Sequence, residues 1–265
     1  MARRRLDAEL VRRGLVASRA EAQEAVHAGQ VLVGGAPATK VTTLVDGDEP
    51  LALTGPARRF VSRGGEKLAA ALDAFAIDPS GLDALDSGAS TGGFTDCLLQ
   101  RDARHVVALD VGHGQLAWEL RTDPRVTVLE RTNVRDLSSS DLPYAPAIVV
   151  ADLSFISLQL AAGPLVAVAS KGAELVLLVK PQFEAGRGSV GRGGVVRDPD
   201  VWRRAIDGVA TAFDEAGARS LGVIPSPITG PAGNVEFLLH ARRGGQEGAL
   251  DPRDAIDRAR ELVGA

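Results

Sequence analysis

The chain has 265 residues, a formal net charge of −4 and one cysteine, Cys97. One cysteine excludes a disulfide framework and a cysteine zinc cluster within the chain, and no apolar run approaches the ~20 residues of a membrane-spanning helix. The basic start of the chain is not followed by an apolar stretch, so we expect no signal peptide, no membrane association and a cytoplasmic protein. We assign no metal ligands.

Residues 1–55 are expected to form a small α+β domain. Apolar residues at positions 6, 10, 11 and 15 predict a helix that ends near Gly14. Ser18, with a glutamate three residues later, forms a capping box that predicts a second helix running to Gly29. Alternating apolar residues then predict short strands over 31–38 and 41–53.

Arginine is concentrated at the start of this acidic chain, where six arginines stand against two acids in residues 1–20. A local basic patch attracts a polyanion, and two short helices can present arginines to phosphates. A solvated helical face is the alternative interpretation. We favour RNA binding through Arg4, Arg5, Arg12, Arg13 and Arg19, continued in a basic linker over residues 56–64 by Arg58, Arg59 and Arg63.

Residues 65–265 alternate short apolar runs with helical patterns, which is typical of an α/β fold with a parallel, doubly wound sheet. A helix is expected from 66 to 75, and a polar helix from Asp251 onward. Further helices are expected near 93–101, 113–121, 157–169 and 200–216. Strands are expected over 82–86, 105–110, 126–130, 147–152, 174–179, 219–224 and 234–240.

The glycine-rich segment Asp86–Phe94 follows the first strand of this region and begins a helix, which is where such folds bind nucleotide-like ligands. Its spacing G-x-x-x-G-G does not fit the dinucleotide fingerprint, and Phe94-Thr95 stands where a phosphate loop needs lysine. The segment also matches the nucleophile elbow around Ser90. That interpretation needs a later acid and then a histidine, and His240, the one candidate, lies in a predicted strand.

An S-adenosylmethionine loop fits better, because an acid ends the strand, glycines allow close approach and a helix begins at the carboxylate of the ligand. A second acid, Asp110, ends the next strand, where it can take ribose hydroxyls. Residues after the third strand are expected to flank the adenine. We therefore assign S-adenosylmethionine binding to Asp86, Ser87, Gly88, Ala89, Ser90, Thr91, Gly92, Gly93, Phe94, Asp110, Asn133 and Val134.

Four polar residues stand where strands end or helices begin: Lys67, Asp152, Lys180 and Glu236. Such a set suits methyl transfer to a ribose 2′-hydroxyl, because a lysine beside another cation and partly desolvated can lose its proton and act as a base. The carboxylates would orient the lysines. Structural ion pairs are the alternative for any one of these residues.

The segment Phe183–Val196 contains five glycines together with Arg187 and Arg192. This composition fits a mobile lid or a contact with the RNA backbone, and equally a flexible surface loop.

The N-terminal motifs Leu-Val-Arg-Arg-Gly-Leu, Ser-Arg-Ala-Glu-Ala and Gly-Gln-Val-Leu-Val-Gly-Gly resemble the S4 RNA-binding module. Asp-Ser-Gly-Ala-Ser-Thr-Gly-Gly-Phe-Thr-Asp, Asp-Val-Gly-His-Gly-Gln-Leu and Val-Lys-Pro-Gln-Phe-Glu resemble the TlyA family of ribosomal RNA methyltransferases, historically labelled haemolysins. The linker departs from some members in carrying Phe60 rather than tryptophan.

The resemblance implies a Rossmann-like, FtsJ-like methyltransferase domain behind an S4 domain. It also implies 2′-O-methylation of cytidine in 16S or 23S ribosomal RNA, or in both, with Lys67, Asp152, Lys180 and Glu236 as the catalytic tetrad. An RNA-binding ribosome-assembly protein without catalysis and a membrane-acting haemolysin are the alternatives. A pseudouridine synthase also carries S4 modules, but the alternating α/β pattern argues against it.

Overall fold

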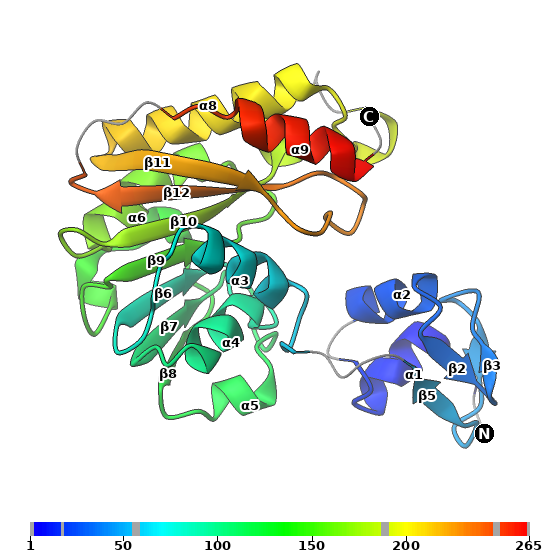
Figure 1. Cartoon of the computed structure of the whole chain (residues 1–265). Helices are drawn as coiled ribbons and strands as arrows, with labels where there is room; N and C mark the ends of the chain where they lie inside the picture. Colours follow the sequence, from blue (N-terminus) through cyan, green and yellow to red (C-terminus); the bar gives the residue numbers. More distant parts are fainter. Residues whose placement is uncertain (1–2, 17–18, 55–58, 187–190, 246–249, 264–265) are drawn as a thin grey trace. The chain divides into compact units, whose positions relative to one another are not determined.

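The computed structural model describes residues 3–16, 19–54, 59–186, 191–245 and 250–263, and the chain divides into two compact units, Met1–Val61 and Ser62–Ala265 (Figure 1). Residues 56–58 of the expected linker lie outside the described residues. Within the described part of the chain, no helix is both long and apolar enough to cross a membrane.

The first unit has its own core, in which the two helices pack against small antiparallel sheets. Gly34 and Gly35 both have positive φ, which suits the two-residue turn between β2 and β3. The serine expected to cap the second helix lies outside the described residues. The elements are β1 (Arg4–Arg5), α1 (Leu6–Arg12), α2 (Arg19–His27), β2 (Val31–Val33), β3 (Ala36–Pro37), β4 (Leu44–Val45) and β5 (Leu51–Leu53).

The second unit is built on a seven-stranded sheet in the order β11-β12-β10-β9-β6-β7-β8. The strands β6 to β10 are mutually parallel, which confirms the α/β, Rossmann-like fold class. The strands are β6 (Asp83–Ser87), β7 (His105–Leu109), β8 (Val126–Leu129), β9 (Ile148–Ala151), β10 (Glu174–Val179), β11 (Ala218–Pro225) and β12 (Phe237–Arg243).

The last two strands correct the prediction of a parallel sheet, because β12 runs antiparallel to both β10 and β11. Only residues 226–236 join β11 to β12, and a parallel pair needs a longer crossover, usually a helix. The chain therefore returns as a hairpin. As a result β12 begins at the edge where β10 ends, with Phe237 opposite Val179.

Helices cover both faces of the sheet, with α3 and α4 on one face and α6 on the other (Figure 1). Asp198 caps α8 by accepting a hydrogen bond from the Asp200 backbone N–H at 2.9 Å, and Pro199 occupies the first helical position. The helices are α3 (Gly64–Ala74), α4 (Gly93–Gln100), α5 (Trp118–Arg121), α6 (Ala162–Val168), α7 (Pro181–Glu184), α8 (Pro199–Glu215) and α9 (Arg253–Val263).

Two predicted helices are shorter than expected. The helix predicted over 113–121 is reduced to α5, and residues 111–117 form bends and irregular backbone beyond the end of β7. The helix predicted over 157–169 is split into the 3-10 turn η3 (Leu158–Leu160) and α6. Both changes leave irregular backbone at the edge of the sheet where the parallel strands end.

Candidate functional site

Asp86, near the end of β6, is fully buried and ties that strand to the start of α4. Its Oδ2 accepts hydrogen bonds from the backbone N–H of Thr95 at 2.9 Å and from the Thr95 hydroxyl at 2.7 Å. Burial raises the pKa of Asp86 to about 7, the Thr95 bonds oppose this, and the charges of Asp152 and Asp110 add to it. Within the described residues Oδ1 has no hydrogen-bond partner.

Two glycines of the loop are required by the backbone. Gly88 has φ +86°, and a Cβ there would lie 2.5 Å from the Asp152 carbonyl oxygen. Gly92 has φ +102°, and a Cβ there would collide with the Leu120 side chain. Any other residue at these positions would be strained and would push neighbouring segments apart.

Ser90 also has positive φ, +48°, and its partners argue against a nucleophilic serine. Its hydroxyl donates to Gln115 Oε1 at 3.3 Å. His240, the histidine an elbow would need, instead contacts Glu174 Oε2 at 2.7 Å. The described residues therefore contain no serine–histidine pair at this loop.

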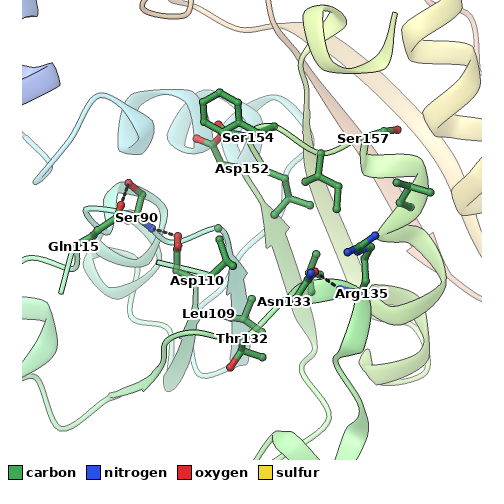
Figure 2. Close-up of a pocket in the computed structure, with 17 residues that line it drawn as sticks. Ser90, Leu109, Asp110, Gln115, Thr132, Asn133, Arg135, Asp152, Ser154 and Ser157 are labelled. Carbon is green, nitrogen blue, oxygen red and sulfur yellow. Dashed lines mark hydrogen bonds between the residues drawn. The ribbon is translucent and has the colours of Figure 1, made fainter. Parts of the chain in front are cut away.

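A cavity of about 750 Å³ opens at the carboxyl ends of β6, β7 and β9 (Figure 2). This is where an open α/β sheet binds its ligand, and the volume is that of a small-molecule site. The residues expected to bind S-adenosylmethionine that line it are Gly88, Ser90, Asp110, Asn133 and Val134.

The other residues assigned to the donor lie outside the lining of this cavity. Asp86 and Ser87 are fully buried behind it, and the Ser87 hydroxyl has no partner within the described residues. Gly93 begins α4 close to Ser62 and Gly65. The remaining ones are Ala89, Thr91, Gly92 and Phe94, and their contact with the donor stays a prediction.

Asp110 connects the glycine loop to the turn after β7. One carboxylate oxygen accepts from the Ser90 N–H at 2.8 Å (Figure 2). The other accepts from the Gly112 N–H at 2.6 Å. Each oxygen has two lone pairs, so Asp110 can still accept hydrogen bonds from ligand hydroxyls. Asn133 caps the 3-10 turn η1 (Val134–Asp136), accepting from the Arg135 N–H at 3.1 Å.

One wall of the cavity was missed by the sequence analysis, namely the loop that follows β9. The position of this loop, at the end of a strand next to β6, is the signal that could have identified it. The lining residues that were not predicted are Leu109, Val111, Gln115, Thr132, Arg135, Leu153, Ser154, Phe155, Ile156, Ser157 and Leu160.

The four polar residues of the predicted tetrad form two close ion pairs. Lys180 Nζ lies 2.5 Å from Asp152 Oδ1, and Lys67 Nζ lies 2.5 Å from Glu236 Oε2. Both lysines and Glu236 are buried, whereas Asp152 also lines the cavity. Glu236 reaches this edge because β12 is antiparallel and begins there.

The sequence analysis placed a lysine beside another cation, and this stays a prediction. Within the described residues each lysine contacts a carboxylate. Lys180 also donates to the Ser154 hydroxyl at 2.8 Å. Each lysine is thus paired with its own carboxylate, Lys180 with Asp152 and Lys67 with Glu236.

A second set of contacts joins the loop after β9 to α7, the helix that follows Lys180. Glu184 accepts from the Ser157 hydroxyl at 2.5 Å and from the Leu158 backbone N–H at 2.8 Å. Burial raises the pKa of Glu184, and these bonds partly offset the rise. The rings of Phe155 and Phe183 are 5.4 Å apart. The loop is thus anchored along its length.

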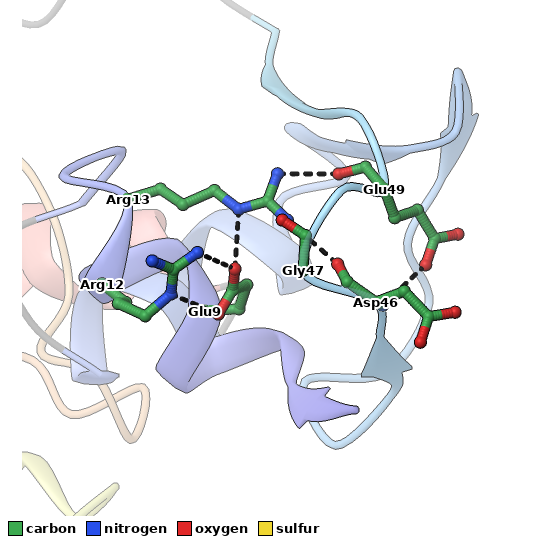
Figure 3. Close-up of polar contacts among 6 residues, drawn as sticks. All are labelled: Glu9, Arg12, Arg13, Asp46, Gly47 and Glu49. Atoms are coloured by element: carbon green, nitrogen blue, oxygen red, sulfur yellow. Dashed lines mark hydrogen bonds and ion pairs between the residues drawn. The ribbon is translucent and has the colours of Figure 1, made fainter. Parts of the chain in front are cut away.

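In the first unit, two buried acids pair with arginines that were assigned to RNA, and Figure 3 shows the contacts of one of them, Glu9. Glu9 is fully buried and pairs with Arg12 at 2.5 Å and with Arg13 at 2.8 Å. These two guanidinium groups lower the pKa of Glu9 to about 2. Arg13 also donates to the carbonyl oxygens of Asp46, Gly47 and Glu49, so its donors are used within the unit.

Asp7 repeats the arrangement. It is fully buried and pairs with Arg5 at 2.9 Å and with Arg19 at 3.0 Å. The side chains of Arg5, Arg12 and Arg19 remain about half exposed, at 45%, 48% and 57%. Arg4 is exposed, and no ion pair to it is found among the described residues. Arg4, Arg5, Arg12 and Arg19 therefore offer cationic surface.

The remaining arginines assigned to RNA are in other settings. Arg59 lies over the ring of Phe60, 4.8 Å from its centroid, and Arg63 donates to the Thr229 carbonyl oxygen at 2.5 Å. Arg58 and Arg187 lie outside the described residues, and of Arg192 only the backbone is described.

The last residues of the segment Phe183–Val196 are hydrogen-bonded to the loop between β11 and β12. The Val196 N–H donates to Asn234 Oδ1 at 2.9 Å, and Asn234 Nδ2 donates to the Gly194 carbonyl oxygen at 2.9 Å. Asn234 is itself buried. Residues 191–196 are therefore anchored, and a lid function for Phe183–Val196 stays a prediction.

Comparison with known proteins agrees with both units. The profile of the S4 domain matches residues 4–50, and that of the FtsJ-like methyltransferases matches residues 60–243. The chain is 55% identical, over 91% of its length and 91% of the relative's, to the 16S/23S rRNA (cytidine-2′-O)-methyltransferase TlyA of Mycobacterium tuberculosis strain H37Rv. It is 38% identical, over 89% of its length and 98% of the relative's, to hemolysin A of Brachyspira hyodysenteriae.

A solved structure described as "Putative hemolysin from Streptococcus thermophilus" has 36% identity and a TM-score of 0.80, covering 100% of this chain and 98% of that one. Proteins named hemolysin and a protein named methyltransferase are thus both similar to this chain over most of its length. The name hemolysin therefore does not indicate a different fold. A glycine loop and an acid-lined cavity at the rim of the sheet are what that fold uses for its ligand. The chain belongs to the FtsJ-like methyltransferase family and carries an S4 domain.

Proposed function

We propose that the protein transfers a methyl group from S-adenosylmethionine to the ribose 2′-hydroxyl of cytidine in ribosomal RNA of one or both subunits. The observation that carries the proposal is the Lys180–Asp152 pair beside the cavity framed by Ser90 and Asp110. A base at the rim of a methyl-donor site is what transfer to a weakly acidic hydroxyl needs. The similarity to TlyA supports the choice of RNA.

The cavity fits the methyl donor chemically. Asp110 keeps free lone pairs for ribose hydroxyls, and Gly88 and Ser90 supply backbone from the loop that leads into α4. Leu109, Val134 and Leu153 provide apolar lining suited to an adenine ring. When bound, the donor supplies a methyl group on a positively charged sulfur, which makes that carbon electrophilic.

Lys180 is assigned as the base and Asp152 as the residue that orients it. The free amine of Lys180 takes the proton of the 2′-hydroxyl while the ribose oxygen bonds to the methyl carbon and the carbon–sulfur bond breaks, leaving its electron pair on sulfur. The lysine then gives its proton to solvent. Lys67, held by Glu236, contributes positive charge and positioning at the same edge.

The first unit is assigned to RNA. Arg5, Arg12 and Arg19 are partly exposed and are held by buried carboxylates, so their guanidinium groups are ordered before RNA binds. Pre-ordered donors lose less side-chain entropy on binding phosphates. Binding by this unit is expected to weaken with salt, because it releases counterions from RNA.

The test is transfer of radiolabel from methyl-labelled S-adenosylmethionine to ribosomal subunits. Lys180→Ala is expected to lower the rate by roughly 10²- to 10⁴-fold, the usual contribution of general base catalysis. Lys171→Ala is the matched control, because Lys171 is an exposed lysine of the same unit outside the cavity lining.

Label that survives Lys180→Ala at the wild-type rate would refute the assigned base. No label from the wild-type protein on either subunit, with RNA binding intact, would favour the non-catalytic alternative.

A further inference from the structure

We propose that Ser154 is a positioning residue for Lys180, and that its hydroxyl fixes the direction in which the amine accepts the proton of the RNA hydroxyl. This inference rests on the proposed function. The observation behind it is the hydrogen bond from Lys180 Nζ to Ser154 Oγ at 2.8 Å, made from a loop that lines the cavity.

The hydrogen bond to Ser154 bears on the direction of the lone pair on the Lys180 amine. A neutral lysine amine has two N–H groups and one lone pair. Ser154 Oγ accepts one N–H at 2.8 Å, and the Asp152 carboxylate contacts the same nitrogen as an ion-pair partner at 2.5 Å. The hydrogen bond to Ser154 fixes one tetrahedral direction of the amine, and the contact with Asp152 limits rotation about it, so the direction of the lone pair is restricted. With Asp152 alone, no hydrogen bond from the described residues would orient the amine.

After the proton has been transferred, Ser154 still accepts one of the three N–H groups of the ammonium, and the Asp152 carboxylate faces its positive charge. One of the other N–H groups carries the proton that came from the ribose. Neither Asp152 nor Ser154 has to move between the two states, so the arrangement is preorganised for the transfer. Ser154 thus acts through Lys180 and forms no bond to the reacting atoms.

Ser154 can serve this role because its loop is held firmly. On the far side of Ser154, Glu184 accepts the Ser157 hydroxyl and the Leu158 N–H, and Phe155 contacts Phe183. Phe183 and Glu184 belong to α7, which begins directly after Lys180. The loop and the base are therefore anchored to the same short helix, and the distance between Ser154 and Lys180 is fixed by several contacts.

If Ser154 had only a structural role, Ser154→Ala would affect folding rather than the rate of methyl transfer. Ser154 is exposed, and its loop keeps the Glu184 anchor without it, so loss of the hydroxyl should change folding little. The effect of Ser154→Ala should then be confined to the catalytic step.

The experiment measures kcat and the KM values for ribosomal RNA and for S-adenosylmethionine in the full-length protein. Ser154→Ala is expected to lower kcat roughly ten- to a hundredfold, as for loss of one hydrogen bond to a charged group, with both KM values within about twofold of wild type. Ser154→Thr, which restores a hydroxyl, should recover most of the rate. Ser139→Ala, an exposed serine outside the cavity lining, is the control.

The double variant Ser154→Ala/Lys180→Ala separates this inference from the proposed function. If Ser154 acts through Lys180, the double variant is no slower than Lys180→Ala. An unchanged kcat for Ser154→Ala, or a raised KM for the methyl donor with kcat unchanged, would overturn the role of Ser154 and leave the base intact. A fully active Lys180→Ala would instead refute the assigned base and with it the role of Ser154, whereas absence of label with the wild-type protein would refute the proposed function.

Discussion

The two units treat buried carboxylates in opposite ways. In the first unit, Asp7 and Glu9 are fully buried and each is paired with two arginines that reach the surface. In the second, Asp86 is fully buried and its hydrogen bonds come from Thr95, a neutral residue. The cations keep the pKa of Glu9 near 2, whereas burial raises that of Asp86 to about 7.

The difference shows two uses of a buried acid. In the first unit the carboxylates are buried and their arginine partners are partly exposed. The carboxylates therefore order a positively charged surface that remains available to a polyanion. In the second unit the lysines Lys67 and Lys180 are themselves buried, the first with its carboxylate and the second beside the partly exposed Asp152. Buried ion pairs add little net stability. In the proposed mechanism, their part is to fix the direction of the lysines.

The largest expected effect comes from breaking one buried pair. Glu236→Ala leaves the Lys67 ammonium buried without its carboxylate, which costs about 3–5 kcal/mol of unfolding free energy. Replacing both residues, as Lys67→Met/Glu236→Leu, should recover most of that loss. Both tryptophans, Trp118 and Trp202, belong to the second unit, so urea unfolding followed by tryptophan fluorescence reports on this unit.

Glu215→Ala removes an exposed acid from the same unit and should change the unfolding free energy by less than about 0.5 kcal/mol. An unaltered urea midpoint for Glu236→Ala would show that Lys67 does not depend on its carboxylate.

The next effect is an opposite response of the two units to pH. The pKa of Asp86 is higher in the folded protein than in the unfolded chain, so its ionisation opposes folding, and stability is lost as pH rises from about 4 to about 7. A shift of this size corresponds to at most about 4 kcal/mol. Glu9 has a lowered pKa, so its contribution is complete above about pH 4.5 and is lost as pH falls toward 2.

Urea unfolding of wild type and Asp86→Asn between pH 4 and 8 tests the first part, because the asparagine variant should lack this loss. Hydrogen exchange of residues 19–54 between pH 5 and 2.5, in wild type and Glu9→Gln, tests the second, after correction for the intrinsic exchange rate. If the unfolding free energies of wild type and Asp86→Asn changed in parallel with pH, the pKa of Asp86 would not be raised by folding.

The smallest expected effect is on RNA affinity. It distinguishes binding that depends on the ordering of the arginines from binding that depends only on net charge. Glu9→Gln removes a negative charge from the first unit, so charge alone predicts tighter RNA binding. If the carboxylate holds Arg12 in place, the variant should instead bind RNA roughly three- to tenfold more weakly at fixed salt, the loss of about 1 kcal/mol expected for one ion-pair contact.

Asp48→Asn is the matched control, because it removes an exposed acid of the same unit and should leave binding equal or slightly tighter. Filter binding or anisotropy with a ribosomal RNA fragment measures both. Tighter binding by Glu9→Gln would show that net charge, rather than arginine order, sets the affinity.

Much of the second unit could be predicted from the sequence, because its buried strands are continuous apolar runs. The strand expected over 174–179 matches β10, and the one over 105–110 ends within one residue of β7. Since parallel strands end at one edge, the polar residues that follow them were expected to gather there. Lys180 and Asp152 do lie together at that edge.

What could not be predicted depends on pairing between distant segments. Hydrophobic periodicity does not give strand direction, so the antiparallel return of β12 was missed, although the short connection 226–236 was a signal for it. Asp7 and Glu9 were counted as charges that dilute a basic patch. Asp7 and Glu9 are buried because of how α1 packs in the first unit, and this packing cannot be predicted from the local sequence pattern.

The antiparallel return of β12 also has a consequence for how the enzyme is made. Lys67 and its partner Glu236 are 169 residues apart, so under the proposed assignment the site stays incomplete until translation has passed residue 236. The first unit, with a core of its own, is synthesised first. A nascent chain can therefore present its arginine surface before it can transfer a methyl group, and every chain truncated before residue 236 lacks a complete site.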